Sequence, residues 1–136
     1  MKRLLDWPAR LAALVSDAHE RAFVWGVHDC CLWASDAVIA VTGHDPAADL
    51  RGRYSNATQA YRILGPLGGL RGVAQRAGPQ IAPGLAAAGD VGIVRFGPRP
   101  MLAVNLGEVW MCAATRGLFA APMGSALMAW KVGGDA

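Results

Sequence analysis

The sequence predicts one domain of the α+β class, with helices in about residues 3–78 and an antiparallel sheet in about residues 89–133. Three observations support this prediction. The chain has 136 residues, of which 54% are hydrophobic and 17% charged, which fits a single folded domain. In the first part, apolar residues recur at three- and four-residue spacings, as in helices. In the second part, short apolar runs alternate with turn residues, as in antiparallel strands.

The first part is predicted to contain four helices. The first helix is amphipathic, with Pro8 in its first turn or at a restart of the helix. The second is apolar around its circumference, so we expect it to be buried, with Asp29 capping its N-terminus and Gly43 its C-terminus. The predicted helices span residues 3–22, 30–41, 56–64 and 70–77.

The second part is predicted to form a sheet of about five strands. Glycine and proline residues separate its apolar runs, so neighbouring strands are expected to pair as hairpins. The expected strands are residues 91–96, 101–106, 109–113 and 129–132, with a further strand or turn near Leu118 and a short helix at residues 124–128.

Charge and hydropathy argue against two classes of partner. Lys and Arg outnumber Asp and Glu by 13 to 10, and the basic residues are scattered singly or in pairs along the chain. A nucleic-acid-binding protein is expected to cluster them, so no nucleic-acid partner is predicted. The longest uncharged run, residues 117–130, is shorter than a spanning helix and contains Pro122, so no membrane span is predicted.

The cysteines are expected to be free thiols. Cys30 and Cys31 are adjacent, and a disulfide between neighbours would be strained. Free thiols agree with a reducing compartment, and later assembly into an extracellular particle would leave the same pattern. The His and Cys residues lack the paired spacing of zinc sites, and the glycine-rich segment 65–72 lacks the lysine of a phosphate loop. No metal or cofactor is predicted.

Cys30 is the candidate nucleophile. It follows Asp29 at the start of the second helix, where unpaired backbone N–H groups and the helix dipole favour a thiolate. The alternative is that the cysteine is a small apolar residue of the core. The sequence does not decide between Cys30 and Cys31 as the residue that faces a cleft.

Four short motifs carry a resemblance to a known family: Trp25-Gly26, Asp29-Cys30, Gly89-Asp90-Val91 and Leu106-Gly107. They resemble the NlpC-type cell-wall peptidases, which are papain-like cysteine amidases. Three further segments, residues 34–38, 42–47 and 50–54, are similar to a branch of this family from phage-derived tail gene clusters. The resemblance implies a papain-like NlpC-type fold, with N-terminal helices packed on the sheet.

The resemblance also implies roles for single residues, and here the sequence departs from the family. The nucleophile falls on Cys30. Met101 stands where the family has its general-base histidine, and Cys112 stands where it has the polar residue that orients this histidine. A thioether cannot accept a proton from a thiol near neutral pH, so Met101 cannot be the base.

One histidine could replace the missing base. His28 lies two residues before Cys30 and could reach the thiol if the loop turns back, although a histidine that helps to cap the helix is the simpler interpretation. His44 lies beyond the far end of the helix, and His19 is expected to face solvent. Trp25 and Asp29 are the residues expected to contact a substrate beside the presumed cleft.

The resemblance therefore implies a catalytically degenerate NlpC-type domain that serves as a structural or cell-wall-binding part of a phage-like tail tip. Its expected partners are tail hub or tail-tip proteins and peptidoglycan. The chain would be made in the bacterial cytoplasm and assembled into a phage-like tail. The alternative is an active cysteine peptidase or amidase that cleaves peptidoglycan through Cys30. A small intracellular adaptor is a third hypothesis.

Overall fold

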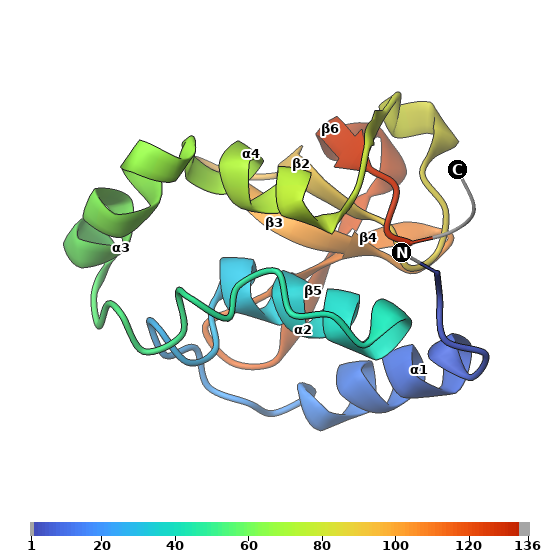
Figure 1. The fold of residues 1–136 in the computed structure, drawn as a ribbon, viewed down its shortest axis with the longest axis horizontal. Helices are drawn as coiled ribbons and strands as arrows, with labels where there is room; N and C mark the ends of the chain where they lie inside the picture. The colour runs from blue at the N-terminus through green and yellow to red at the C-terminus, as the bar shows by residue number, and fades with distance from the viewer. Residues whose placement is uncertain (1, 134–136) are drawn as a thin grey trace.

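The computed structural model describes residues 2–133 and shows helices packed on an open antiparallel sheet of six strands (Figure 1). The α+β class predicted from the sequence is confirmed. Helices occupy the first part of the chain and most of the strands the second. No helix within residues 2–133 combines the length and the apolar character needed to cross a bilayer.

The sheet has one strand more than the five or so predicted. The additional strand, β1, follows Pro79 and contains only two residues, which pair with the last strand, β6. The order of the strands across the sheet is β1-β6-β2-β3-β4-β5. The strands are β1 (Gln80–Ile81), β2 (Val91–Arg95), β3 (Pro100–Asn105), β4 (Val109–Ala113), β5 (Leu118–Pro122) and β6 (Ala126–Trp130).

The prediction of a short helix at residues 124–128 is wrong. Only one 3-10 turn, Met123–Ser125, forms there, and the chain then enters β6. In β6, Ala129 and Trp130 are fully buried and pair with Gly92 and Val91 of β2. Sheet pairing on both sides of β6 therefore overrides the local preference for a helical turn.

The four predicted helices form, with different lengths. Helix α1 begins after Asp6, has proline in its first turn and ends at Asp17, so it is shorter than the predicted residues 3–22. Arg3 and Ala22, at the ends of the predicted helix, instead contact residues of the sheet part. The helices are α1 (Trp7–Asp17), α2 (Cys30–Thr42), α3 (Ala57–Leu64) and α4 (Gly69–Ala74), with 3-10 turns at Gly65–Leu67, Gln75–Ala77 and Pro83–Leu85.

Helix α2 is the central helix of the domain and both predicted caps are confirmed. Asp29 is extended and its side chain accepts a hydrogen bond from the Leu32 N–H, as an N-cap does. Gly43 ends the helix with φ of 78°, in the left-handed region that favours glycine. Helix α2 packs on β3 and β4, and α1 packs on its outer side, as Figure 1 shows.

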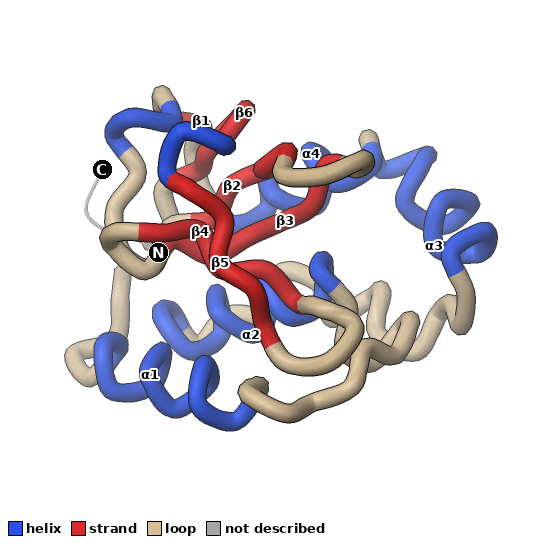
Figure 2. Tube along the Cα trace, turned by 180° about the vertical axis from the view of Figure 1, so that it is seen from behind, coloured by secondary structure: helices blue, strands red, loops and turns tan. Residues whose placement is uncertain are grey.

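The sheet buries apolar side chains on both faces. On the face toward α2 and α4, Ile93, Leu102 and Val104 belong to the main core. On the other face, a second cluster forms around Trp110, which is fully buried and donates from Nε1 to the Met123 carbonyl over 3.2 Å. Figure 2 shows the strands from the side opposite to that of Figure 1, with α2 and α1 below them.

The N-terminal segment is fastened to the sheet by a buried ion pair. The Arg3 guanidinium lies 2.9 Å from the fully buried carboxylate of Asp90 and also donates to the carbonyls of Ala88 and Val132. Asp90 accepts two further bonds, from the Ala87 and Val132 N–H groups. The aspartate of the Gly89-Asp90 motif therefore joins the N-terminal segment to the residues that follow the last strand.

Candidate functional site

Asp29 organises the loop that leads into α2. Besides the capping bond from Leu32, its carboxylate accepts the Gly26 N–H over 3.0 Å and the Tyr54 hydroxyl over 2.8 Å. Asp29 is 1% exposed. A buried carboxylate that accepts three hydrogen bonds is committed to holding the loop, the helix and the segment before α3 together. The sequence analysis had expected Asp29 to contact a substrate, but its carboxylate is buried and bonded within the chain.

Tyr54 is a site residue that the sequence analysis did not assign a role. It lies in a segment that the family resemblance included, and its hydroxyl completes the Asp29 network. Gly26 packs directly against its backbone: a Cβ at position 26 would lie 1.9 Å from the Tyr54 carbonyl oxygen. Gly26 also has φ of 81°, so both space and backbone conformation require glycine there.

Cys30 is the first residue of α2. Its residue is partly exposed, but packing around the sulfur raises the pKa of the thiol from 9.0 to about 11. The backbone N–H groups of Leu102, Cys31 and Cys30 itself act in the opposite direction, while the Asp29 carboxylate raises the pKa further. Burial outweighs the helix N-terminus here, so the thiol is protonated at neutral pH.

Cys31 points into the main core instead. Its residue is 2% exposed, and burial raises the pKa of its thiol. Of the two residues, Cys30 thus keeps some exposed surface and Cys31 is buried.

His28 lies two residues before Cys30 in the sequence. Its side chain is buried but makes no hydrogen bond to the Cys30 thiol. The residue is 1% exposed, and neither ring nitrogen has a hydrogen-bond partner among residues 2–133. Its backbone pairs with Val24, which closes a tight loop around residues 25–27. In this structure the imidazole is therefore not positioned as the base for Cys30.

The buried imidazole predicts that the domain loses stability in acid. Burial, aided by the charge of Arg21, lowers the pKa of His28 below its ordinary value of 6.5, although Asp29 acts in the opposite direction. The unfolded chain then binds the proton more tightly, so the free energy of unfolding falls as the pH drops from about 7 to about 5. Chemical denaturation of a His28→Phe variant at both pH values is expected to show a smaller fall. The exposed-site variant His44→Phe should behave like the parent, and equal falls in all three proteins would refute the assignment.

Met101 and Cys112 share the face of the sheet that lies away from α2. Met101 pairs with Val94 across β2 and β3, and Val94 belongs to the second cluster, as does the fully buried Cys112. Successive strand residues face opposite sides, so Leu102 and not Met101 points toward α2. Burial raises the pKa of the Cys112 thiol to about 12, and a negative charge on Cys30 would act in the same direction.

Trp25 packs against the core, and the two remaining histidines, His19 and His44, are exposed. The Trp25 ring meets Phe23 edge to face, with centroids 4.9 Å apart, and lies 6.5 Å from the Tyr54 ring. It is half-buried and packs against the main core. His19 and His44 are exposed, the latter beyond the C-terminus of α2 as predicted.

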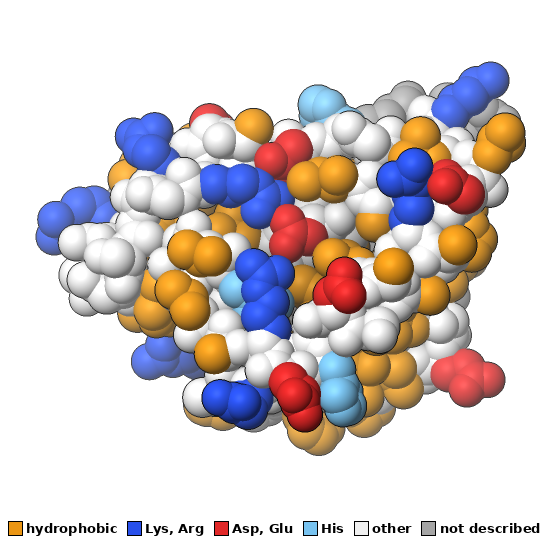
Figure 3. Space-filling view, turned by 90° about the horizontal axis from the view of Figure 1, so that it is seen from below, with side chains coloured by type: hydrophobic (Ala, Val, Ile, Leu, Met, Phe, Trp, Pro, Cys, Tyr) orange, Lys and Arg blue, Asp and Glu red, His pale blue; other side chains and the backbone are white. Residues whose placement is uncertain are grey.

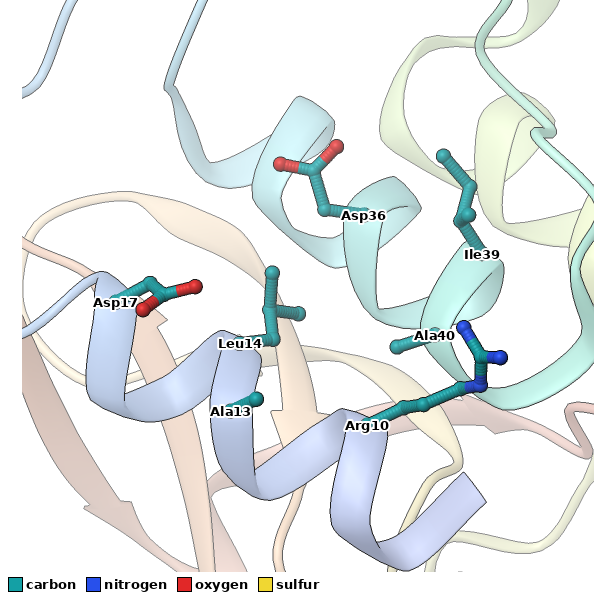
Figure 4. A pocket seen from close by; sticks show the side chains of 7 residues that line it. All are labelled: Arg10, Ala13, Leu14, Asp17, Asp36, Ile39 and Ala40. Atoms are coloured by element: carbon teal, nitrogen blue, oxygen red, sulfur yellow. The ribbon is translucent and has the colours of Figure 1, made fainter. Parts of the chain in front are cut away.

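A groove between α1 and α2 holds none of the predicted site residues (Figure 4). Its volume is about 390 Å³. Two of its charged residues have partners within the chain, because Asp36 pairs with Arg51 at 2.8 Å and Arg10 with Asp6 at 2.9 Å. Burial raises the pKa of Asp36 despite the nearby guanidinium. The groove is lined by Arg10, Ala13, Leu14, Asp17, Asp36, Ile39 and Ala40.

Potential metal ligands do not gather in the described part of the chain. Within residues 2–133, no three His, Cys, Asp or Glu side chains lie close enough together to hold a metal ion.

Comparison with known proteins adds a family but no activity. The model of a family described as a domain of unknown function, DUF6950, matches residues 2–132. No curated protein and no solved structure matches the chain.

Proposed function

The chain belongs to the DUF6950 family, and we propose a function for it. In this proposal the chain is a catalytically degenerate NlpC-type domain with a papain-like fold. It serves as a structural or cell-wall-binding part of a phage-like tail tip. The NlpC-type fold and the tail location rest on the motif resemblance, which is an analogy. The loss of catalysis rests on the geometry around Cys30.

One observation carries the loss of catalysis: among residues 2–133 no imidazole is hydrogen-bonded to the Cys30 sulfur, whereas a cysteine peptidase needs one there to activate its thiol. Neither ring nitrogen of His28 has a hydrogen-bond partner within the described residues 2–133, and Met101, at the position of the family's base, carries a thioether directed to the far face of the sheet. A thiol with its pKa raised to about 11 is a poor nucleophile near neutral pH.

A second observation supports a binding or structural role. The loop before α2 is held by the Asp29 network, which fixes Gly26 and Tyr54 while leaving Val24 and Val27 about half exposed, at 48% and 54%. A rigid loop with exposed apolar side chains suits recognition of a partner, because little entropy is lost on binding. The degenerate domain would thus keep the framework of its site for binding.

The alternative proposal is an active cysteine peptidase or amidase in which a partner protein supplies the base. It retains Cys30 as the nucleophile, at the only one of the three cysteines with exposed surface. The two proposals differ in whether the protein cleaves peptidoglycan, so one experiment with purified sacculi distinguishes them.

Sedimentation with purified peptidoglycan sacculi tests the proposal. The parent protein is expected to cosediment with sacculi, or with tails from a phage-like particle, without releasing soluble cell-wall fragments. The Cys30→Ala variant should sediment equally well. Release of fragments by the parent that Cys30→Ala abolishes would establish the active alternative. Sedimentation with neither sacculi nor tails would refute the structural role.

A further inference from the structure

The chain has a strongly asymmetric distribution of charge that the overall balance of +3 conceals. Between residues 53 and 99 every cation is an arginine, and the sole acidic residue is Asp90. Asp90 is fully buried and pairs with Arg3 from outside this segment. The arginines of the segment are Arg53, Arg62, Arg71, Arg76, Arg95 and Arg99.

Most of these arginines are not neutralised within the chain. Arg76 pairs with Asp49 at 2.7 Å. The others form no ion pair with an acidic residue among residues 2–133, and all of them are exposed. Their charge is thus available to a molecule outside the chain.

The fold brings four of them to one end of the domain. Arg62 is on α3, Arg71 on α4, and Arg95 and Arg99 flank the turn between β2 and β3. Helix α4 packs against α3 and against β2 and β3, and Figure 2 shows the β2–β3 turn beside α4 at the end where α3 lies. A hydrogen bond of 3.3 Å from Arg99 to the Tyr61 hydroxyl ties the turn to α3.

Exposed aromatic rings lie among these guanidinium groups. Tyr61 is 61% exposed and Phe96 52% exposed. Figure 3 shows basic and hydrophobic side chains together at the end of the molecule where α3 lies. We call this region, made of Tyr61, Arg62, Arg71, Arg95, Phe96 and Arg99, the arginine surface.

The composition of the arginine surface favours a protein partner. Protein interfaces are enriched in Arg and aromatic residues and depleted of Lys, and this segment has no Lys at all. Surfaces that follow a nucleic-acid backbone generally use both cations along a groove. The groove between α1 and α2 contains none of the residues of the arginine surface.

We propose that the arginine surface docks an acidic, partly apolar surface of another protein. Its carboxylates would pair with the free guanidinium groups, and its apolar residues would cover Tyr61 and Phe96. This inference goes beyond the proposed function, because it concerns a different surface and holds whether or not Cys30 is catalytic.

Binding of two polyanions by the full chain tests this inference. The probes are a random copolymer of glutamate and tyrosine and an oligothymidylate of about 20 nucleotides, each followed by fluorescence anisotropy at low ionic strength. The variant Arg62→Glu/Arg99→Glu changes two exposed residues of the surface. Lys2→Glu/Arg116→Glu is the matched control, since it changes the net charge equally at exposed residues elsewhere.

The parent is expected to bind the acidic copolymer more tightly than the oligothymidylate. Arg62→Glu/Arg99→Glu should weaken copolymer binding at least about tenfold, and the control by less than about threefold. Equal losses in the two variants would mean that only net charge matters and would overturn the proposal. Tighter binding of the oligothymidylate, with the same sensitivity to the surface variant, would replace it with a nucleic-acid surface. Circular dichroism of each variant establishes that it is folded.

Discussion

Replacing Asp29 by alanine is expected to lower the free energy of unfolding by about 3–5 kcal/mol, a large part of the stability of a domain of this size. The change leaves three buried donors without their acceptor: the N–H groups of Gly26 and Leu32 and the Tyr54 hydroxyl. Each buried donor left unsatisfied costs about 1–3 kcal/mol. Urea denaturation of the parent and the variant measures the difference.

Asn56→Ala is the matched control for this change. Asn56 caps α3 as Asp29 caps α2, by accepting a hydrogen bond from the N–H three residues later, but it is exposed and its side chain accepts no second hydrogen bond within residues 2–133. Loss of an exposed N-cap costs about 1 kcal/mol. Similar losses for the two variants would show that Asp29 acts only as a cap and that its bonds to Gly26 and Tyr54 contribute little.

The parts of the fold that sequence analysis predicted best are those fixed by local signals. Asp29 and Gly43 define the ends of α2 because capping and the left-handed C-terminal conformation depend on residues next to the helix. The strands around Gly107 were predicted for a similar reason, since a glycine with φ of 103° marks the turn between β3 and β4.

The parts that were missed depend on contacts between distant segments. β1 exists only because Gln80 and Ile81 pair with β6, almost 50 residues later, and no pattern of two residues predicts this. Likewise, α1 stops before the end of its apolar pattern because Ala22 joins the turn at Arg116.

The candidate site shows the same division. The position of Cys30 at the start of a helix was predictable, but the raised pKa of its thiol was not, because it depends on the packing of the sheet around the sulfur. The role of Tyr54 also escaped sequence analysis, since its bond to Asp29 spans 25 residues. The signal that could have suggested this role is that Tyr54 lies in one of the segments that carry the family resemblance.

The second large effect is the slow reaction of Cys30 with alkylating agents. With a pKa of about 11, only about one Cys30 side chain in ten thousand is a thiolate at pH 7, compared with a few per cent for an ordinary cysteine. Alkylation at neutral pH should therefore be about two orders of magnitude slower than that of a model thiol. Cys31 and Cys112 are buried and should react still less in the folded chain, and the Cys30→Ala variant measures their contribution.

The rate of iodoacetamide addition to Cys30 between about pH 6 and pH 11, measured by mass spectrometry of the folded protein, tests most directly whether this thiol lacks an activating imidazole. The structure predicts a rate that stays low at neutral pH and rises tenfold per pH unit until the pH approaches about 11. Rapid modification at pH 6–7 with a plateau near neutrality, lost in His28→Phe, would show an activated thiolate and contradict the account.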